Sequence, residues 1–422
     1  MSKRSDSSGP ESETRPTADP TADRRGFLKR SAAVAGVALA PMFGAQSVAA
    51  ASTLESEIES IRSDYDLNGV SLAIAREDPN SWGSVPTVEK DLQIGESDPD
   101  SGDPVDPSHR FRLGSISKTL TATGIMKLYE DGDLDLDRQV FPTGQSCFSC
   151  GTEEDPLFDS SNGELDYATF YFTEVEVRHL LDHTSGFEGD NGDIVYDDDG
   201  LPEDCHHSQD DVMEHLLDNF TVTTPPGDDY DYQNINYFVL GRVIEEVTGE
   251  DYTTWMKDDV LSYAAADEMD TYEMLDADED GWEKMDNEVE YHEYINYYAC
   301  QETMGRRDAH GGWIASPGTA AQEFWRIFNP NTITGPLDDS TVDEMTERQG
   351  DNSDYAYGVR HYDNAGNPIG HSGKSPGGFA AMRYRTEDDY CFVITVNDDT
   401  DKHGDARDEL VDATHSFIDT VL

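Results

Sequence analysis

Basic residues are scarce in this chain. Its 422 residues include 29 Lys and Arg against 89 Asp and Glu, which gives a formal net charge of −60, and only nine residues are Lys. No basic patch is visible along the chain, whereas nucleic acids and anionic membrane surfaces attract clustered Lys and Arg. The composition therefore argues against nucleic acid and anionic membranes as partners.

The acidic residues recur along the whole chain and are not confined to a tail. Runs such as 131–137 and 276–280 alternate with segments that contain aromatic residues, and the chain has 20 Tyr and 16 Phe. We interpret the acids as the solvated surface of a folded chain, whose self-repulsion weakens as salt screens it. High acid content with few Lys resembles the proteins of extreme halophiles such as haloarchaea, and it predicts a fold that depends on salt.

A hydrophobic run long enough to span a bilayer is also missing. The apolar stretch 32–43 is short, it follows Arg24-Arg25, and small residues occupy 49–51. This pattern resembles a twin-arginine export signal, so we expect residues 1–51 to be a signal and disordered N-terminus. The protein would then be extracellular or at the cell surface, with no stable membrane insertion after cleavage. The alternative is a chance Arg pair before a disordered tail.

Cysteine is rare, and the five cysteines fall into two groups. Cys391 lies in the apolar run 390–396 and is expected to be a buried thiol on a strand. Outside the cytoplasm the other four predict two disulfides, with a structural zinc site or free thiols as alternatives. These four are Cys147 and Cys150, which have ligand spacing, Cys205, which precedes two His, and Cys300.

Hydrophobic periodicity predicts strands near both ends of the chain and helices between them. The predicted strands are 69–75, 91–94, 357–361, 379–385 and 390–396, and a loop is expected at 96–109. The predicted helices are 52–65, 117–130, 175–181, 236–247, 313–328 and 406–421. We expect an α+β fold in which residues 52–140 and 345–422 form an antiparallel sheet flanked by helices. A mostly helical domain at 141–344, with acidic insertions at 141–172 and 188–210, would be inserted between them.

Ser115 and Lys118 form the first candidate catalytic motif. If a helix begins at Ser115, the two side chains lie one turn apart on the same face. The start of a helix offers free N–H groups and a positive dipole end, which stabilise an oxyanion and lower the pKa of a nearby Lys. A serine hydroxyl needs a base within hydrogen-bond reach to become a nucleophile, and a Lys in a dry site can supply it.

Tyr232 and Asn234 form the second motif, on a turn before an apolar helix. A Tyr near a cationic Lys ionises more easily and can relay a proton. The Asn amide can orient the Lys or bind a substrate amide. Tyr230 is the alternative in register, and Tyr232 is preferred because Asn234 follows two residues later. Without the other motifs, the segment also fits an aromatic turn with an Asn helix cap.

The third motif is the glycine-rich segment 370–379, which contains His371, Gly373 and Lys374. A Gly leaves room for a substrate along a strand edge, and such an edge binds an extended acyl group through main-chain hydrogen bonds. A glycine-rich hairpin is the structural alternative.

Together these motifs resemble the active-site boxes of serine β-lactamases and penicillin-binding proteins. The resemblance is closest to the class C β-lactamase and esterase branch, and it extends to the flanking segments 111–128, 180–186 and 311–316 and covers most of residues 55–420. It implies that Ser115 is the acylated nucleophile and that Lys118 and Tyr232 share the proton transfers. Asn234, His371, Gly373 and Lys374 would bind substrate, with the backbone N–H groups of Ser115 and Lys374 as the oxyanion hole.

One departure from the family pattern bears on the substrate. His371 stands where a true class C β-lactamase has a Lys that meets the substrate carboxylate, and Lys374 is one step beyond the box. We therefore expect an exported serine hydrolase that acts on a small ester, amide or peptide, without cofactor or catalytic metal. The alternatives are a non-catalytic binding or sensor domain on the same scaffold, or a true β-lactamase.

Overall fold

A computed structural model describes residues 45–78, 86–141, 167–187, 208–219, 222, 224–271, 285–291, 305–329, 335–349, 354–363, 366–375, 377–398 and 402–422. The expected export signal lies almost entirely outside these residues. So do Cys147, Cys150, Cys205 and Cys300, together with most of the expected insertions at 141–172 and 188–210.

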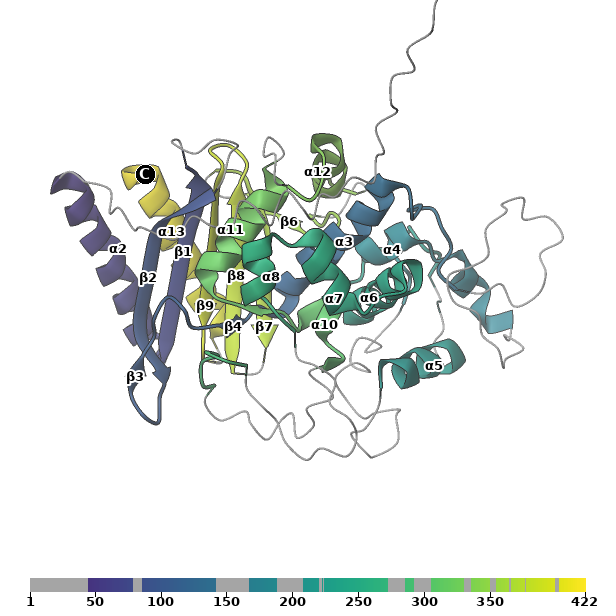
Figure 1. Ribbon diagram of the computed structural model, residues 1–422, viewed down its shortest axis with the longest axis horizontal. Helices are drawn as coiled ribbons and strands as arrows, with labels where there is room; N and C mark the ends of the chain where they lie inside the picture. Colours follow the sequence, from purple (N-terminus) through teal and green to yellow (C-terminus); the bar gives the residue numbers. More distant parts are fainter. Residues whose placement is uncertain are drawn as a thin grey trace, which may run out of the picture. The chain divides into compact units, whose positions relative to one another are not determined.

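A seven-stranded antiparallel sheet takes its strands from the two ends of the chain (Figure 1). In spatial order these are β3 (Asp103–Pro104), β2 (Pro86–Asp98), β1 (Gly69–Glu77), β9 (Tyr390–Val396), β8 (Gly378–Arg385), β7 (Pro368–Ser375) and β6 (Arg360–His361). The first strand of the N-terminal part, β1, therefore pairs with the last strand of the chain, with Val70 opposite Val396. The expected antiparallel α+β fold is confirmed.

Helices cover both faces of this sheet. Helices α2 (Ala45–Asp64) and α13 (His403–Val421) pack on one face, and α11 (Pro317–Phe328) packs against β1 and β9 on the other. Side chains alternate along β1, so Leu72 and Ile74 belong to the core beneath α13, whereas Ala73 and Ala75 belong to the core shared with the helical region. Because both faces are covered, the central strands β1, β8 and β9 are buried along nearly their whole length.

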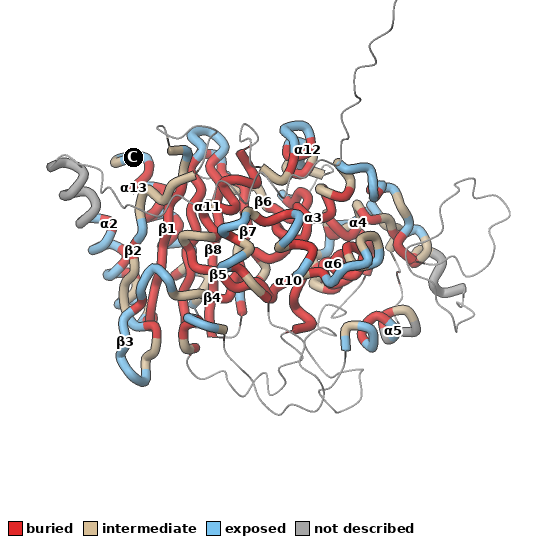
Figure 2. Tube along the Cα trace, viewed as in Figure 1, coloured by how far each residue is buried: buried red, intermediate tan, exposed pale blue. Residues whose placement is uncertain are grey.

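The helical region places a buried helix beside the sheet. A short 3₁₀ turn, η1 (Gly114–Ile116), leads into α3 (Ser117–Asp131), which is buried along most of its length and ends at the left-handed Gly132 (Figure 2). Its neighbours include α6 (Asn234–Thr248) and α10 (Asp308–Gly311). The remaining elements are η2 (Tyr167–Glu174), α4 (Val177–Leu181), α5 (Gln209–Asn219), α7 (Tyr252–Trp255), a π-helical turn (Met256–Val260), α8 (Tyr263–Glu268) and α12 (Asp339–Thr346).

Three expected boundaries are wrong. The helix expected at 313–328 begins at Pro317, because Ile314–Ala315 forms strand β5 and pairs with β4 (Phe111–Arg112). The loop expected at 96–109 contains the end of β2 and all of β3. The strand expected at 357–361 is reduced to its last two residues, which form β6. No helix in the described part of the chain is both long and apolar enough to cross a bilayer.

Candidate active site

The turn that carries Ser115 is fixed by a close backbone approach. Gly114 has a positive φ of 53°, and a Cβ at this position would lie 2.8 Å from the backbone N and O of Lys374. Any side chain there would push β7 away from η1. Ser115 is half-buried on this turn, and Lys118, one turn later on α3, places its Nζ 3.0 Å from Ser115 Oγ. The two residues of the first motif therefore meet as expected.

Lys118 is fully buried, and its surroundings favour the neutral amine. Its Nζ donates to Asn234 Oδ1 at 2.7 Å and to the His310 carbonyl at 2.8 Å. Burial, assisted by the positive charges of Arg307 and Arg360, holds the pKa of Lys118 well below its usual value. A neutral amine has two N–H donors and one lone pair. The two acceptors take both donors, which leaves the lone pair for the Ser115 hydroxyl.

The ring of Tyr232 lies against Lys118, whereas Tyr230 contacts Arg360. The centroid of the Tyr232 ring is 5.0 Å from Lys118 Nζ, on the extended loop that precedes α6. Tyr230 is more exposed, at 37%, and its hydroxyl accepts a hydrogen bond from Arg360 Nη2 at 3.0 Å. Of the two tyrosines that the sequence offered, Tyr232 is thus the one whose ring lies next to Lys118.

A buried histidine holds the loop of Tyr232. His183 has a left-handed backbone, with φ of 61°, and its Nδ1 accepts from the Gln233 backbone N–H at 3.2 Å and lies 3.0 Å from Asn236 Nδ2. Its ring centroid is 4.4 Å from that of Tyr232. Burial, with the Lys118 charge, lowers its pKa well below the usual value, so the ring is neutral. The sequence indicated this segment only through the family resemblance and gave no sign of the contact.

Strand β7 passes directly by the nucleophile turn. It pairs with β8 along its whole length but with β6 only through Ile369 and Gly370, so no described strand pairs with its other edge from His371 onward. A Cβ on Gly373 would lie 1.9 Å from Leu113 O and 3.2 Å from Ser115 N. The backbone amides of Ser115 and Lys374 therefore lie at the contact between β7 and η1, while the Lys374 residue is exposed.

The side chain of His371 is buried. Its Nδ1 lies 2.7 Å from the Ser372 carbonyl, which can only accept, so Nδ1 carries the proton. Its Nε2 then accepts from the Tyr355 hydroxyl at 3.2 Å. Burial, followed by the charges of Lys118 and Arg360, holds the pKa of His371 well below its usual value. The third motif therefore contributes a neutral ring at this position.

Arg360 is the cation near the site that sequence reasoning missed. It is half-buried on β6, and its guanidinium carbon lies 5.3 Å from the centroid of the Tyr232 ring and 5.0 Å from that of Tyr355. Its charge helps to lower the pKa values of Lys118 and His371. The sequence predicted a strand here, but only the pairing of β6 with β7 places its Arg beside the tyrosines.

Among the described residues, no group of three or more His, Cys, Asp or Glu side chains is placed to hold a metal ion. The arrangement is a serine hydroxyl next to a buried amine, flanked by a tyrosine and by an edge of β7 that no described strand pairs from His371 onward. Such a site suits acyl transfer through a serine nucleophile.

Comparison with known proteins identifies the family. The family model described as Beta-lactamase matches residues 42–416, so the chain belongs to the β-lactamase family of serine hydrolases, which includes penicillin-binding-protein homologues. Penicillin-binding protein 4 of Amycolatopsis lactamdurans is 28% identical over 151 residues, which are 35% of this chain and 32% of that protein. The chain covers about a third of the length of the curated relatives that it matches.

Solved structures share the fold at low sequence identity. The structure of SurE with D-Leu has a TM-score of 0.63 and 19% identity, covering 88% of this chain and 76% of that one. D-amino acid amidase from Ochrobactrum anthropi SV3, complexed with L-phenylalanine amide, has a TM-score of 0.60 and 18% identity, covering 87% of this chain and 98% of that one. These similarities show the fold.

Proposed function

We propose that this protein is an exported serine hydrolase that acts on a small amide, ester or peptide through an acyl-enzyme on Ser115. The observation that carries the proposal is the environment of Lys118. Its two N–H groups are taken by Asn234 and His310, and its Nζ lies 3.0 Å from Ser115 Oγ. An amine held in this way can accept the serine proton as a general base.

The reaction proceeds in two balanced steps. In the first, the Ser115 Oγ forms a bond to the substrate carbonyl carbon while its proton passes to Lys118 Nζ. The scissile C–N or C–O bond then breaks, and the departing amine or alcohol takes a proton from the Lys118 and Tyr232 pair. In the second step, water adds to the acyl carbon and gives its proton to the same pair, and Ser115 leaves with its proton restored. The oxyanion is bound by the backbone amides of Ser115 and Lys374.

A neutral acyl substrate fits this site best. From His371 onward, the edge of β7 that no described strand pairs can bind an extended acyl group, and the ring of His371 is buried and neutral. One of the two solved structures above contains D-Leu, and the other is a D-amino acid amidase complexed with L-phenylalanine amide, which supports a D-amino-acid amide or a short ester as the substrate. We place the chain in the esterase and class C branch of the family because its motifs have the forms Ser-x-x-Lys, Tyr-x-Asn and His-x-Gly.

A true β-lactamase is the second candidate, and Arg360 is the observation that favours it. A guanidinium beside Tyr232 can pair with a substrate carboxylate. However, this group already donates to Tyr230 and lies over two aromatic rings. The kcat/KM values for a p-nitrophenyl ester, a D-amino-acid amide and nitrocefin in molar salt distinguish the candidates. We expect nitrocefin to be the poorest substrate, and nitrocefin as the best by about tenfold would make the protein a β-lactamase.

Covalent labelling tests the nucleophile directly. Incubation with a fluorophosphonate should add one phosphonyl group, with loss of fluoride, to the peptide that contains Ser115. The Ser115→Ala variant should remain folded and unlabelled, whereas Ser101→Ala, at an exposed turn, should label like the parent. Labelling that persists in Ser115→Ala would refute the assignment, and a parent that never labels or turns over substrate would favour the binding or sensor alternative.

The proposed location and source rest on the sequence alone. Arg24-Arg25 and the short apolar run that follows support export by the twin-arginine route, and the acid-rich composition supports a halophilic source. Replacing both arginines with Lys in a fusion to a reporter that is active only after twin-arginine export should abolish its activity. Export that continues unchanged would contradict the proposed signal.

A further inference from the structure

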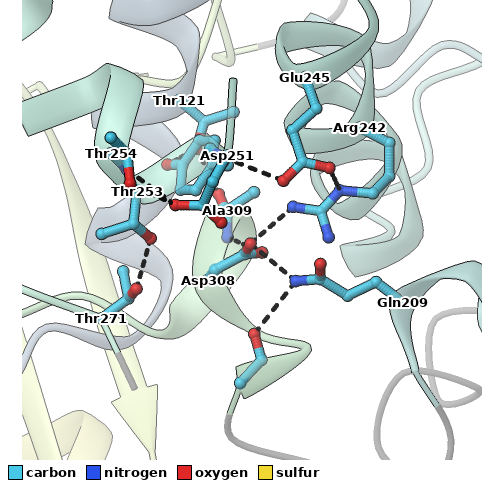
Figure 3. A network of polar contacts seen from close by, with 12 residues as sticks. Thr121, Gln209, Arg242, Glu245, Asp251, Thr253, Thr254, Thr271, Asp308 and Ala309 are labelled. Atoms are coloured by element: carbon cyan, nitrogen blue, oxygen red, sulfur yellow. Dashed lines mark hydrogen bonds and ion pairs between the residues drawn. The ribbon is translucent and has the colours of Figure 1, made fainter. Parts of the chain in front are cut away.

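Three consecutive residues of α10 are hydrogen-bonded to the elements that build the site, and Figure 3 shows the first two, Asp308 and Ala309. The Asp308 carboxylate accepts from Arg242 of α6 at 2.6 Å and from Gln209 of α5 at 2.8 Å. The carbonyl of Ala309 accepts from the Thr121 hydroxyl of α3 at 2.5 Å. The carbonyl of the next residue, His310, accepts from Lys118. A displacement of α10 would therefore move the carbonyl that accepts from Lys118 Nζ.

Helix α6 controls both acceptors of the Lys118 amine. Asn234, at its first residue, accepts directly from Lys118. Arg242, later on the same helix, forms the ion pair with Asp308 in a position where both side chains are almost inaccessible to solvent. The two helices also touch closely, because a Cβ on Gly241 would lie only 2.5 Å from Ala309 Cβ. One rigid helix thus sets the positions of Asn234 Oδ1 and, through α10, of the His310 carbonyl.

We propose that the Arg242–Asp308 ion pair is a positioning pair for acylation, which holds α10 against α6 so that the His310 carbonyl occupies one N–H of Lys118 and the lone pair faces Ser115. This inference rests on the proposed function of Ser115 and Lys118. Neither Arg242 nor Asp308 contacts the reacting atoms, so their effect is transmitted through backbone position. Glu245 also pairs with Arg242, at 3.0 Å, and would partly compensate the guanidinium if Asp308 lost its charge.

The direction in which the pKa of Lys118 changes when Asp308 is replaced distinguishes a positioning role of Asp308 from a purely electrostatic one. Removing a nearby carboxylate, with nothing else altered, disfavours an ammonium and lowers the pKa of Lys118. Loosening α10 does the opposite, since desolvation is the main cause of the low pKa and Arg307, on the residue before α10, is the next cause. Water entry and withdrawal of Arg307 both raise the pKa. The other titratable or charged groups around Lys118 are Tyr232, Tyr237, His183, His310, Arg360 and His371.

The test measures Lys118 directly and does not require turnover. Protein labelled with ¹³C-lysine gives signals for nine lysines, and the Lys118 Cε signal is identified by its loss in Lys118→Arg. In Asp308→Asn we expect the midpoint of the Lys118 titration to rise by about one pH unit. At a pH below both midpoints, the rate of fluorophosphonate labelling should fall about tenfold, because the neutral fraction of Lys118 falls by that factor. Glu323→Gln is the matched control, because Glu323 pairs with Arg326 in an equally buried position away from Lys118.

An uncharged variant completes the test. Gly241→Ala changes no charge and favours helix, but its methyl group would press on Ala309 and displace α10. It should raise the Lys118 midpoint in the same direction as Asp308→Asn. An unchanged or lowered midpoint in both variants, with the proteins folded by circular dichroism, would overturn the positioning role. If the parent neither labels nor hydrolyses, the proposed function fails, while the NMR titration still decides the positioning of Lys118.

Discussion

Lys118 offers two N–H donors and, when neutral, one lone pair, and its three polar neighbours match this set. Asn234 Oδ1 and the His310 carbonyl can only accept, whereas the Ser115 hydroxyl can donate. With this geometry, Lys118 can accept the proton of the Ser115 hydroxyl only when the amine is neutral. We therefore expect the protonation state of Lys118 to control the reactivity of Ser115.

A pH profile should show this control. The pKa of Lys118 is lower in the folded protein than the ordinary value of 10.5, so the neutral base accumulates as pH rises through the folded value. For a neutral ester, kcat/KM should therefore increase with pH and reach a plateau well below pH 10.5. The same shift means that unfolded chains bind more protons in the window between the two pKa values, so this residue makes stability rise with pH there. A kcat/KM that climbs only near pH 10 would contradict a depressed pKa.

Tyr232 and Tyr230 form a natural pair for mutation. Tyr232→Phe retains the ring that lies 5.0 Å from Lys118 Nζ but removes the hydroxyl that we propose relays protons. We expect kcat for an ester to fall by about 100-fold or more, the range typical of lost acid–base help. Tyr230→Phe removes a hydroxyl that accepts a hydrogen bond from Arg360, and it should change kcat by less than about threefold. Similar rates in both variants would remove Tyr232 from the mechanism.

Strand β7 and turn η1 approach each other closely at the proposed oxyanion site. Glycines occur on both sides of the contact, Gly114 on the turn and Gly373 on the strand, because a Cβ on either would collide with the opposing backbone. The amides of Ser115 and Lys374 depend on this approach. The glycine of the third motif is therefore required by backbone proximity.

Gly373→Ala tests that approach. A Cβ at this position would lie 1.9 Å from Leu113 O, so β7 and η1 must separate and the two amides no longer converge on one oxyanion. Acylation by fluorophosphonate should slow by about 100-fold, while the melting temperature should fall by only a few degrees if the sheet adjusts at its edge. Gly404→Ala is the control, because no atom lies within 4 Å of a Cβ there and the residue belongs to α13. Equal acylation rates in both variants would argue against the close approach.

The net charge of −60 acts on the molecule as a whole. Many acidic side chains on the described surface are exposed and have few cations nearby, so their repulsion opposes the compact state until salt screens it. The most stable parts are expected to be the two hydrophobic cores on either side of the sheet.

The melting temperature should therefore climb steeply from low to molar KCl. At low salt the Debye length of roughly 30 Å lets charges across the whole surface repel, and at molar salt it falls to roughly 3 Å. Sucrose at matched osmolality serves as the control, because it favours compact states without screening charge. A melting temperature that is flat in KCl, or that rises equally in sucrose, would show that charge repulsion does not limit stability.

The sequence by itself determined the features that depend on residues close together in the chain. Ser115 and Lys118 are one helical turn apart, the apolar runs of β1 and β9 marked the sheet, and the order of the three motifs indicated the family. Tertiary structure decided the rest. Lys118 meets Asn234 across 116 positions and His310 across 192, and the second contact is to a backbone carbonyl that has no residue signature. His183 and Arg360 reach the site only because a left-handed turn and the β6–β7 pairing carry them there. Local spacing follows from the geometry of one helix, whereas the pKa of a buried amine depends on every element that excludes water from it.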